Sequence, residues 1–209
     1  MVMIVGISLK ISGETKINLN EGSNAANDGQ LITEARNDPA AFGRLYRRHY
    51  DAVFRYCVHR LFERQAAEDV TSTVFLKVVE NLGRFKGDKQ QFRNWLYKIA
   101  TNAVNDHLRR GARRKRVLKV AGEQVSRRTV DCRDVTDTSA ERVALLKEAM
   151  LALKPRYQTI ITLRFFENLK LTEIAEVLGS SPGTVRSQLA RALAKLRKKI
   201  GPALQEISK

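Results

Sequence analysis

The chain of 209 residues is strongly basic, with 38 Lys and Arg against 22 Asp and Glu and a formal net charge of +16 at pH 7. A chain of this length has room for one large or two small domains with hydrophobic cores. The charge indicates a polyanionic partner, and nucleic acid fits better than a membrane because no apolar run approaches the roughly 20 residues of a bilayer span. Cys57 and Cys132 cannot build a disulfide framework or a zinc cluster by themselves, which favours the cytoplasm.

Residues 1–36 differ in composition from the rest of the chain. The first eleven are apolar but lack the basic region and cleavage site of a secretory signal, and residues 18–30 are rich in Asn, Gly and Ser. We expect a flexible N-terminal tail over 1–36. A translation start further into the chain is an alternative explanation of this segment.

A helical domain is predicted over 37–112. Asp38 suits a helix cap and Pro39 the first turn. Apolar side chains then recur at helical spacing in three stretches, 42–61, 65–82 and 92–108. Three helices with matched apolar faces can bury a common core.

The third predicted helix carries a polar outer face and leads into a basic run. That face holds Arg93, Asn94, Lys98, Thr101, Asn102, Asn105, Asp106 and Arg109. Six of the eight residues at 109–116 are basic. Such a run is usually a solvated linker, but beside an amide-rich helix face it would also lie well along a nucleic-acid backbone. The apolar pattern then breaks, and we predict a linker over 113–137.

A second helical domain is predicted over 138–205, and its last part has the pattern of a helix-turn-helix. Residues 171–178 form one apolar helix face, and Gly179 suits the left-handed residue that ends a helix. Ser181 is a good N-cap for the next helix, with Pro182 in its first position. We find no alternating strand pattern, so the predicted fold is all-α, with two small domains joined by a flexible linker.

The outer face of this last helix is polar and basic. It holds Thr184, Arg186, Ser187, Gln188 and Arg191, followed by Lys195, Arg197, Lys198 and Lys199. A capped second helix with such a face can enter a DNA major groove, with its early residues at base edges and its later cations near phosphates. The alternative is a helical hairpin with a solvated basic face.

Four stretches, taken in order, resemble the bacterial RNA polymerase sigma factors of the sigma-70 family, in its extracytoplasmic-function group. The stretches are AFGRLYRRHYDAVFRY, AAEDVTSTVFLKVVENLGRFKGD, FRNWLYKIATNAVNDHLRR and LKPRYQTIITLRFFENLKLTEIAEVLGSSPGTVRSQLARALAKLRKKI. The resemblance covers roughly residues 41–199 and therefore both predicted domains.

The resemblance implies a transcription initiation factor that binds core RNA polymerase and directs it to promoters. The first domain would bind the clamp helices of the largest polymerase subunit and melt the −10 element, and the second would read the −35 element as duplex and lie near the flap of the second subunit. The family also implies an anti-sigma factor as a partner, and a cytoplasmic location at the nucleoid. It implies no enzymatic activity, cofactor, metal site or membrane insertion.

Three sets of residues follow from the resemblance by position. Core polymerase would be bound by Glu68, Asp69, Thr73 and Lys77. The −10 element would be contacted by Phe85, Lys86, Asp88, Asn94, Lys98, Asn102, Asp106 and Arg109, of which the first three lie in a loop that would hold a flipped base. The −35 element would be read by Thr184, Arg186, Ser187, Gln188 and Arg191.

The residue types support part of this assignment independently. An unstacked base needs an aromatic or polar pocket, which the loop around Phe85 offers, and the amides of Asn94 and Asn102 can both donate to and accept from base edges. Phe85 has an equally simple alternative role as a core residue that closes the corner between two helices. Trp95 lies on the apolar face and is expected in the core.

The chain departs from the family pattern at three places. Ser72 and Thr73 stand where members commonly carry Gln-Glu, which removes a charge from the expected polymerase contact. The loop between Gly87 and Phe92 is one residue longer than usual. Lys170 replaces the usual cap of the first helix of the helix-turn-helix, a loss of about 1 kcal/mol.

Three other classes of function remain as alternatives. A sigma-like protein that only titrates an anti-sigma factor would not need base-reading cations such as Arg186 and Arg191. A dimeric helix-turn-helix repressor would leave the first domain unexplained. An enzyme is disfavoured because the sequence lacks a Gly-rich phosphate loop, a His or Cys cluster and a carboxylate pair with a base nearby.

Overall fold

The computed structural model describes residues 28–120 and 138–207, and these ranges contain eight α-helices, one π-helical turn and no strand. The elements are α1 (Asp28–Glu34), α2 (Pro39–Leu61), α3 (Arg64–Leu82), α4 (Lys89–Val120), α5 (Thr138–Leu151), α6 (Pro155–Ile161), the turn η2 (Thr162–Phe166), α7 (Leu171–Leu178) and α8 (Pro182–Ile207). The all-α prediction is confirmed. The tail prediction for residues 1–27 and the linker prediction for 121–137 lie outside the described residues.

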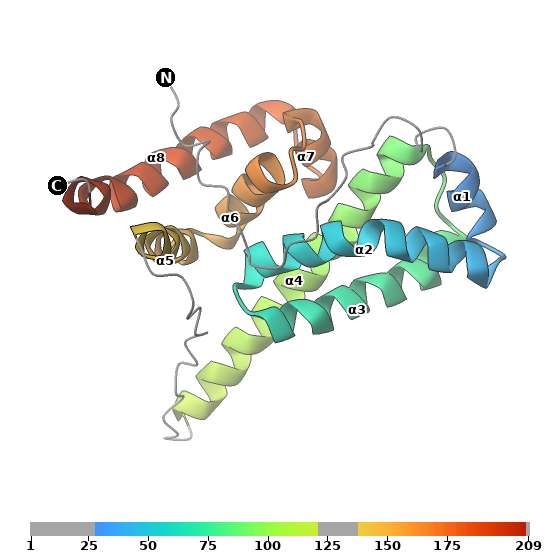
Figure 1. Ribbon diagram of the computed structural model, residues 1–209, viewed down its shortest axis with the longest axis horizontal. Helices are drawn as coiled ribbons and strands as arrows, with labels where there is room; N and C mark the ends of the chain where they lie inside the picture. Colours follow the sequence, from blue (N-terminus) through green and yellow to red (C-terminus); the bar gives the residue numbers. More distant parts are fainter. Residues whose placement is uncertain (1–27, 121–137, 208–209) are drawn as a thin grey trace.

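Helices α2, α3 and α4 form the first unit, with α2 and α3 side by side and α4 crossing both (Figure 1). Asp38 caps α2 as predicted, because its carboxylate accepts hydrogen bonds from the backbone N–H groups of Ala40 at 2.8 Å and Ala41 at 3.1 Å. Phe62 ends α2 in the left-handed region, with φ 54°. Cys57 lies in the core, and burial raises the pKa of its thiol to about 11.

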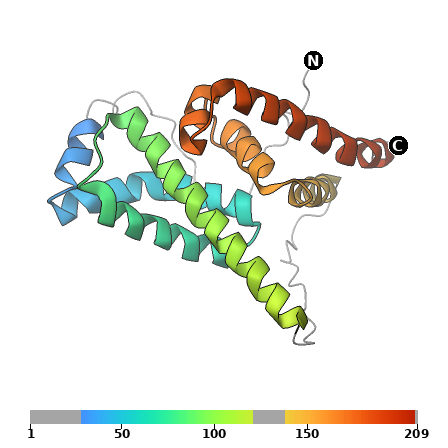
Figure 2. The same cartoon turned by 180° about the vertical axis from the view of Figure 1, so that it is seen from behind.

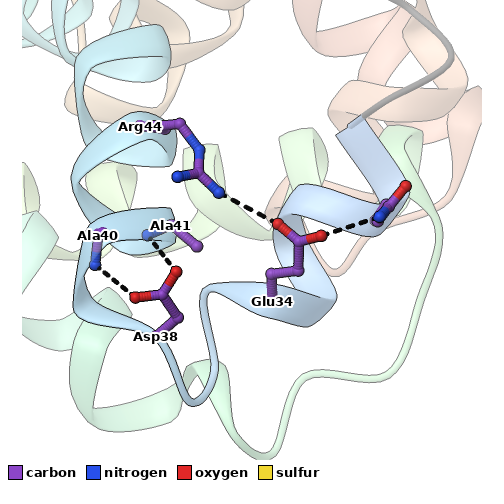
Figure 3. A network of polar contacts seen from close by, with 6 residues as sticks. Glu34, Asp38, Ala40, Ala41 and Arg44 are labelled. Atoms are coloured by element: carbon purple, nitrogen blue, oxygen red, sulfur yellow. Dashed lines mark hydrogen bonds and ion pairs between the residues drawn. The ribbon is translucent and has the colours of Figure 1, made fainter.

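The first unit begins earlier than predicted, because helix α1 packs against it. Leu31, Ile32 and Ala35 are buried against the core of α2 and α4. Figure 3 shows Glu34 paired with Arg44 of α2 at 3.1 Å beside the Asp38 cap. The predicted tail over 1–36 was therefore wrong for residues 28–36, because three apolar residues were enough to fold a segment of polar composition onto the domain.

The predicted start of the linker at residue 113 lies inside helix α4. The helix continues without a break to Val120, so residues 113–120, which were predicted to be linker, are helical. Both views show its C-terminal end projecting past α2 and α3 and away from α5 to α8 (Figures 1 and 2). Residues 109, 110, 113, 114 and 116 are exposed there. We call residues 109–116 the basic arm.

Helices α5 to α8 form the second unit, which contains the predicted helix-turn-helix. Gly179 closes α7 in the left-handed region with φ 58°, and Ser181 Oγ accepts the N–H of Thr184 at 3.1 Å, as an N-cap of α8 should. Lys170 cannot accept such a bond. Glu173 compensates in part, because its Oε2 accepts the backbone N–H of Lys170 at 2.5 Å.

We predict opposite effects for the same substitution at two glycines. Gly43 lies inside α2 and Gly179 in the left-handed turn, and at both sites an added Cβ meets no atom within 4 Å. Gly43→Ala should stabilise the protein by about 0.5 to 1 kcal/mol, because alanine loses less backbone entropy in a helix. Gly179→Ala should destabilise it by about 1 to 2 kcal/mol through left-handed strain. Chemical denaturation followed by circular dichroism measures both, and changes of the same sign would contradict the assignment.

Candidate nucleic-acid interface

The predicted DNA-reading side chains of α8 lie on one accessible face. Thr184, Arg186, Ser187 and Arg191 are exposed and Gln188 is partly exposed. The opposite face packs into the unit through Val185, Ala192 and Leu196, which are buried. The helix is therefore held by its buried face, and its polar and basic face is accessible.

Short-range contacts fix several of these side chains. Thr184 Oγ1 lies 2.8 Å from Ser181 Oγ, and Ser187 Oγ donates to the carbonyl oxygen of Gly183 at 3.1 Å. Arg156 Nε, at the start of α6, donates to Gln188 Oε1 at 2.7 Å. The Arg156 contact was missed by the sequence reasoning, because the two residues are 32 positions apart and no local pattern links them. It orients the amide of Gln188 at the edge of the exposed face.

The loop before α4 has a different construction from the predicted base pocket. The Phe85 side chain is only 8% exposed and its ring packs against Phe92 and Trp95, with centroids 5.5 and 5.0 Å apart. Arg36 Nη2 also donates to the Phe85 carbonyl at 2.8 Å. Phe85 is thus a core residue, which corrects its placement beside a flipped base and agrees with the alternative role. Trp95 packs against the same core, as predicted.

The remaining loop residues are exposed, but one of them also forms hydrogen bonds at the start of α4. Lys86 and Asp88 are both exposed. Asp88 Oδ1 accepts the N–H of Gln91 at 2.8 Å, and Gln91 Oε1 accepts the N–H of Asp88 at 3.0 Å. This reciprocal pair is a capping box at the start of α4. The spacing Asp-x-x-Gln was visible in the sequence and could have located the helix start.

The predicted −10 face of α4 is divided into an exposed and a covered part. Lys98, Asn102 and Arg109 are exposed. Asp106 is half-buried and accepts from Arg109 at 2.7 Å, with Lys77 of α3 at 3.9 Å. Asn94 is only 5% exposed, and its Nδ2 donates to Glu176 Oε2 of α7 at 2.6 Å. In this arrangement of the chain Asn94 cannot touch a base.

A buried carboxylate holds the two units together at this place. Glu167, directly after η2, accepts the hydroxyl of Tyr97 on its Oε2 at 2.6 Å, and its backbone carbonyl accepts Arg93 Nη2 at 2.7 Å. Burial raises the pKa of the Glu167 carboxyl above its ordinary value, and burial together with the Glu167 charge raises the pKa of the Tyr97 hydroxyl. One turn away, Gln90 Nε2 donates to Glu173 Oε1 at 2.6 Å.

A second contact joins the end of α2 to the second unit. The guanidinium of Arg60 is buried and donates to Gln158 Oε1 of α6 at 2.6 Å. The His59 ring lies 4.1 Å from the ring of Phe166, centroid to centroid. Burial, with a smaller contribution from the charge of Arg55, lowers the pKa of His59 to about 4. His59 is therefore neutral at pH 7.

The predicted polymerase-binding residues share α3 with two exposed apolar side chains. Glu68 and Asp69 are exposed, whereas Thr73 and Lys77 are partly exposed. Leu76 is 65% and Val79 54% exposed, which is unusual for large apolar side chains on a helix whose other face is buried. The sequence reasoning missed both. They could have been found as apolar residues outside the core-facing spacing of this helix.

Within residues 28–120 and 138–207, no three His, Cys, Asp or Glu side chains gather as metal ligands would. No helix in the described part of the chain combines the length and apolar character needed to cross a bilayer.

Comparison with known proteins gives matches to two parts of one family. Residues 45–114 match sigma-70 region 2, and residues 144–196 match sigma-70, region 4. The RNA polymerase sigma-H factor of Pseudomonas aeruginosa is 32% identical over 188 residues, which cover 86% of this chain and 96% of that protein. The ECF RNA polymerase sigma factor BldN of Streptomyces coelicolor is 34% identical over 83% of this chain, and the match spans 66% of that protein's length.

Two solved structures share the fold. CnrH in complex with the cytosolic domain of CnrY matches with a TM-score of 0.60 and 26% identity, over 87% of this chain and 99% of CnrH. RpoE of Bartonella quintana, solved with the anti-sigma factor NepR, also gives a TM-score of 0.60, at 18% identity over 77% of this chain and 96% of RpoE.

The helix-turn-helix, the helical first unit and these matches define a class of protein, the transcription initiation factors that direct RNA polymerase to promoters. The chain belongs to the sigma-70 family, in its extracytoplasmic-function group.

We predict that His59 makes the folded protein sensitive to acid. Unfolded histidine takes up a proton near pH 6.5, whereas the folded side chain stays neutral down to about pH 4. Stability should therefore fall as the pH drops through this window, by up to about 3 kcal/mol from this group. His59→Phe keeps a ring against Phe166 and should remove this dependence. The measurement is urea denaturation of both proteins from pH 4 to pH 7.

The difference between the two denaturation curves isolates His59. The pKa of Glu167 is raised, so the stability that this group contributes is lost as pH rises above 4.5. This contribution is the same in both proteins and cancels in the difference. Parallel curves for the two proteins would show that His59 has the same pKa in the folded and the unfolded protein, which would contradict the prediction.

Proposed function

We propose that this chain binds core RNA polymerase through α3 and then recognises a promoter at two places, the −35 element with α8 and the −10 element with α4 and the loop before it. The observation that carries the proposal is the exposed face of α8, where Arg186 and Arg191 project from a helix whose other face is anchored in the core. Such a helix fits a DNA major groove.

The −35 element is read as duplex. Thr184, Arg186, Ser187 and Gln188 lie in the first two turns of α8, where a recognition helix contacts base edges. Arginine suits guanine because it donates two parallel hydrogen bonds to O6 and N7, and glutamine suits adenine. Arg191 completes this base-reading set one turn further along the helix. Lys195, Lys198 and Lys199 follow and lie near phosphates, which adds affinity without sequence preference.

The −10 element is contacted by the exposed part of α4. Lys98, Asn102 and Arg109 are accessible in the structure, with Lys86 and Asp88 in the loop at one end of the helix. Asn94 joins them only after α7 leaves α4, because Glu176 holds its amide at 2.6 Å. Promoter binding thus requires the two units to separate, and a base edge then replaces the Glu176 carboxylate as the partner of the Asn94 amide.

Core polymerase is bound by the exposed face of α3. Glu68, Asp69 and Thr73 supply polar contacts to the clamp helices of the largest subunit, and Lys77 lies at the border with α4. Leu76 and Val79 are well placed to bury apolar surface in the same contact. This burial offsets the charge that is missing at Ser72 and Thr73. The second unit lies near the flap of the second-largest subunit, which sets its distance from the first.

The proposal includes a regulator and a location. An anti-sigma factor is the expected regulator, since RpoE of Bartonella quintana was solved with the anti-sigma factor NepR and shares this fold. The chain acts in the cytoplasm at the nucleoid, where polymerase and promoters are. It works as a binding protein and not as an enzyme, and it takes no cofactor.

We predict promoter-specific transcription when the protein is added to bacterial core polymerase. A run-off assay on genomic promoter fragments should give discrete transcripts that core polymerase alone does not give. Absence of a specific transcript from every fragment, with core binding intact, would instead favour a sigma-like protein that only titrates an anti-sigma factor.

We predict that two cations on α8 affect DNA binding in different ways. Arg186→Ala should weaken binding by about 1 to 3 kcal/mol at particular −35 base pairs and relax specificity there. Lys198→Ala should weaken binding to all sequences alike and lower the salt slope by about one. Binding of the holoenzyme to single-base variants of a mapped promoter measures both. Equal losses on promoter and random DNA for both variants would remove Arg186 from the base-reading set.

A further inference from the structure

The basic arm continues the −10 face of α4 to the end of the family match and two residues beyond it. The match to sigma-70 region 2 ends at residue 114, whereas α4 continues to Val120. The arm carries six basic residues and no acidic one. It projects from the body of the protein in both views (Figures 1 and 2).

The exposed arginines of the arm form two rows on the helix. At about 100° per residue, Arg113 and Arg116 fall within about 40° of Arg109 around the axis. Lys98 and Asn102 fall within about 20° of the same line, so this row continues the proposed −10 face in register. Arg110 and Arg114 form a second row, about 100° to 140° away from Arg109. All five arginines are exposed.

We infer that Arg113 and Arg116 bind the phosphates of duplex DNA directly upstream of the −10 element. The inference rests on the proposed function of α4. The loop around Lys86 lies at the N-terminal end of this helix, where the strands are proposed to separate, so the arm at the other end lies over DNA that is still paired. A straight row of guanidinium groups on a rigid helix suits the regular phosphates of a duplex.

The length of the helix sets how far this contact reaches. Asn102 and Arg116 are 14 residues apart, which is about 21 Å along an α-helix. Successive phosphates of one strand are about 3.4 Å apart along the axis, so the row reaches about six base pairs beyond the bases at Asn102. The contact is with phosphates only, so it adds affinity and not sequence preference.

The test compares two double variants in the full chain bound to core polymerase. Arg113→Ala with Arg116→Ala removes the row in register, and Arg110→Ala with Arg114→Ala removes the same two charges from the other row. Alanine is the best helix former, so both variants keep α4 intact. Circular dichroism and binding to core polymerase without DNA confirm that each variant is folded and assembled.

Two fork-junction probes are made from a promoter mapped by the run-off assay, and neither contains the −35 element. In one the duplex ends directly upstream of the −10 element, and in the other it extends about 12 base pairs further, beyond the reach of the arm. Binding of each holoenzyme is measured from low to high salt. On the long probe, the Arg113 and Arg116 double variant should lower the slope of log K against log salt by about two. On the short probe it should match the wild type, and the control variant should change little on either.

Two results would overturn the inference. Equal slopes for the two double variants on the long probe would show that the Arg113 and Arg116 row makes no contact of its own. Equal losses on the short and long probes would place the contact elsewhere. Failure of the wild-type holoenzyme to bind either probe would instead refute the proposed function itself.

Discussion

The buried carboxylate of Glu167 is the interaction on which the arrangement of the two units depends. A carboxylate loses its hydration when it is buried, and this loss is tolerated only where other groups replace the water. Tyr97 of α4 replaces this water at Oε2, and Arg93 donates to the backbone carbonyl of the same residue. Oε1 is buried without a hydrogen-bond partner among the described residues. The contact is therefore strongly coupled, because losing either donor leaves a buried acceptor without its partner. Together with the bonds of Asn94 to Glu176 and of Gln90 to Glu173, it holds α7 against α4.

This coupling means that the protein faces its two partners in turn. The faces of α8 and α3 are exposed while the units are packed together, but Asn94 of α4 lies under α7. In the proposed function, polymerase meets Leu76 and Val79 before the two units separate. Binding that holds the second unit away from α4 would then uncover Asn94. The proposal therefore links polymerase binding to promoter access through one interface.

Local sequence patterns predicted the helices well, because caps and apolar periodicity are properties of neighbouring residues. Asp38, Gly179 and Ser181 all act at helix ends as predicted. The errors lie where distant contacts decide. Residues 28–36 look like a tail until α2 and α4 offer a surface for Leu31 and Ile32, and Phe85 is a core residue because Phe92 and Trp95 surround it. The interface at Glu167 joins residues 70 positions apart, which no local pattern specifies. The roles assigned to the DNA and polymerase faces remain proposals based on exposure and chemistry.

The basic arm contains two features that weaken a helix, a glycine and like charges four residues apart. Gly111 interrupts it at a point where an added Cβ would meet no neighbouring atom within 4 Å, and glycine inside a helix is about 0.5 to 1 kcal/mol less favourable than alanine. Arginines four residues apart repel each other by a few tenths of a kcal/mol more. Dissolved anions relieve this repulsion, and a polyanion does so far more effectively because it arrives with its charges already aligned. The arm is thus a helix that already forms without a ligand, and a bound polyanion would stabilise it further.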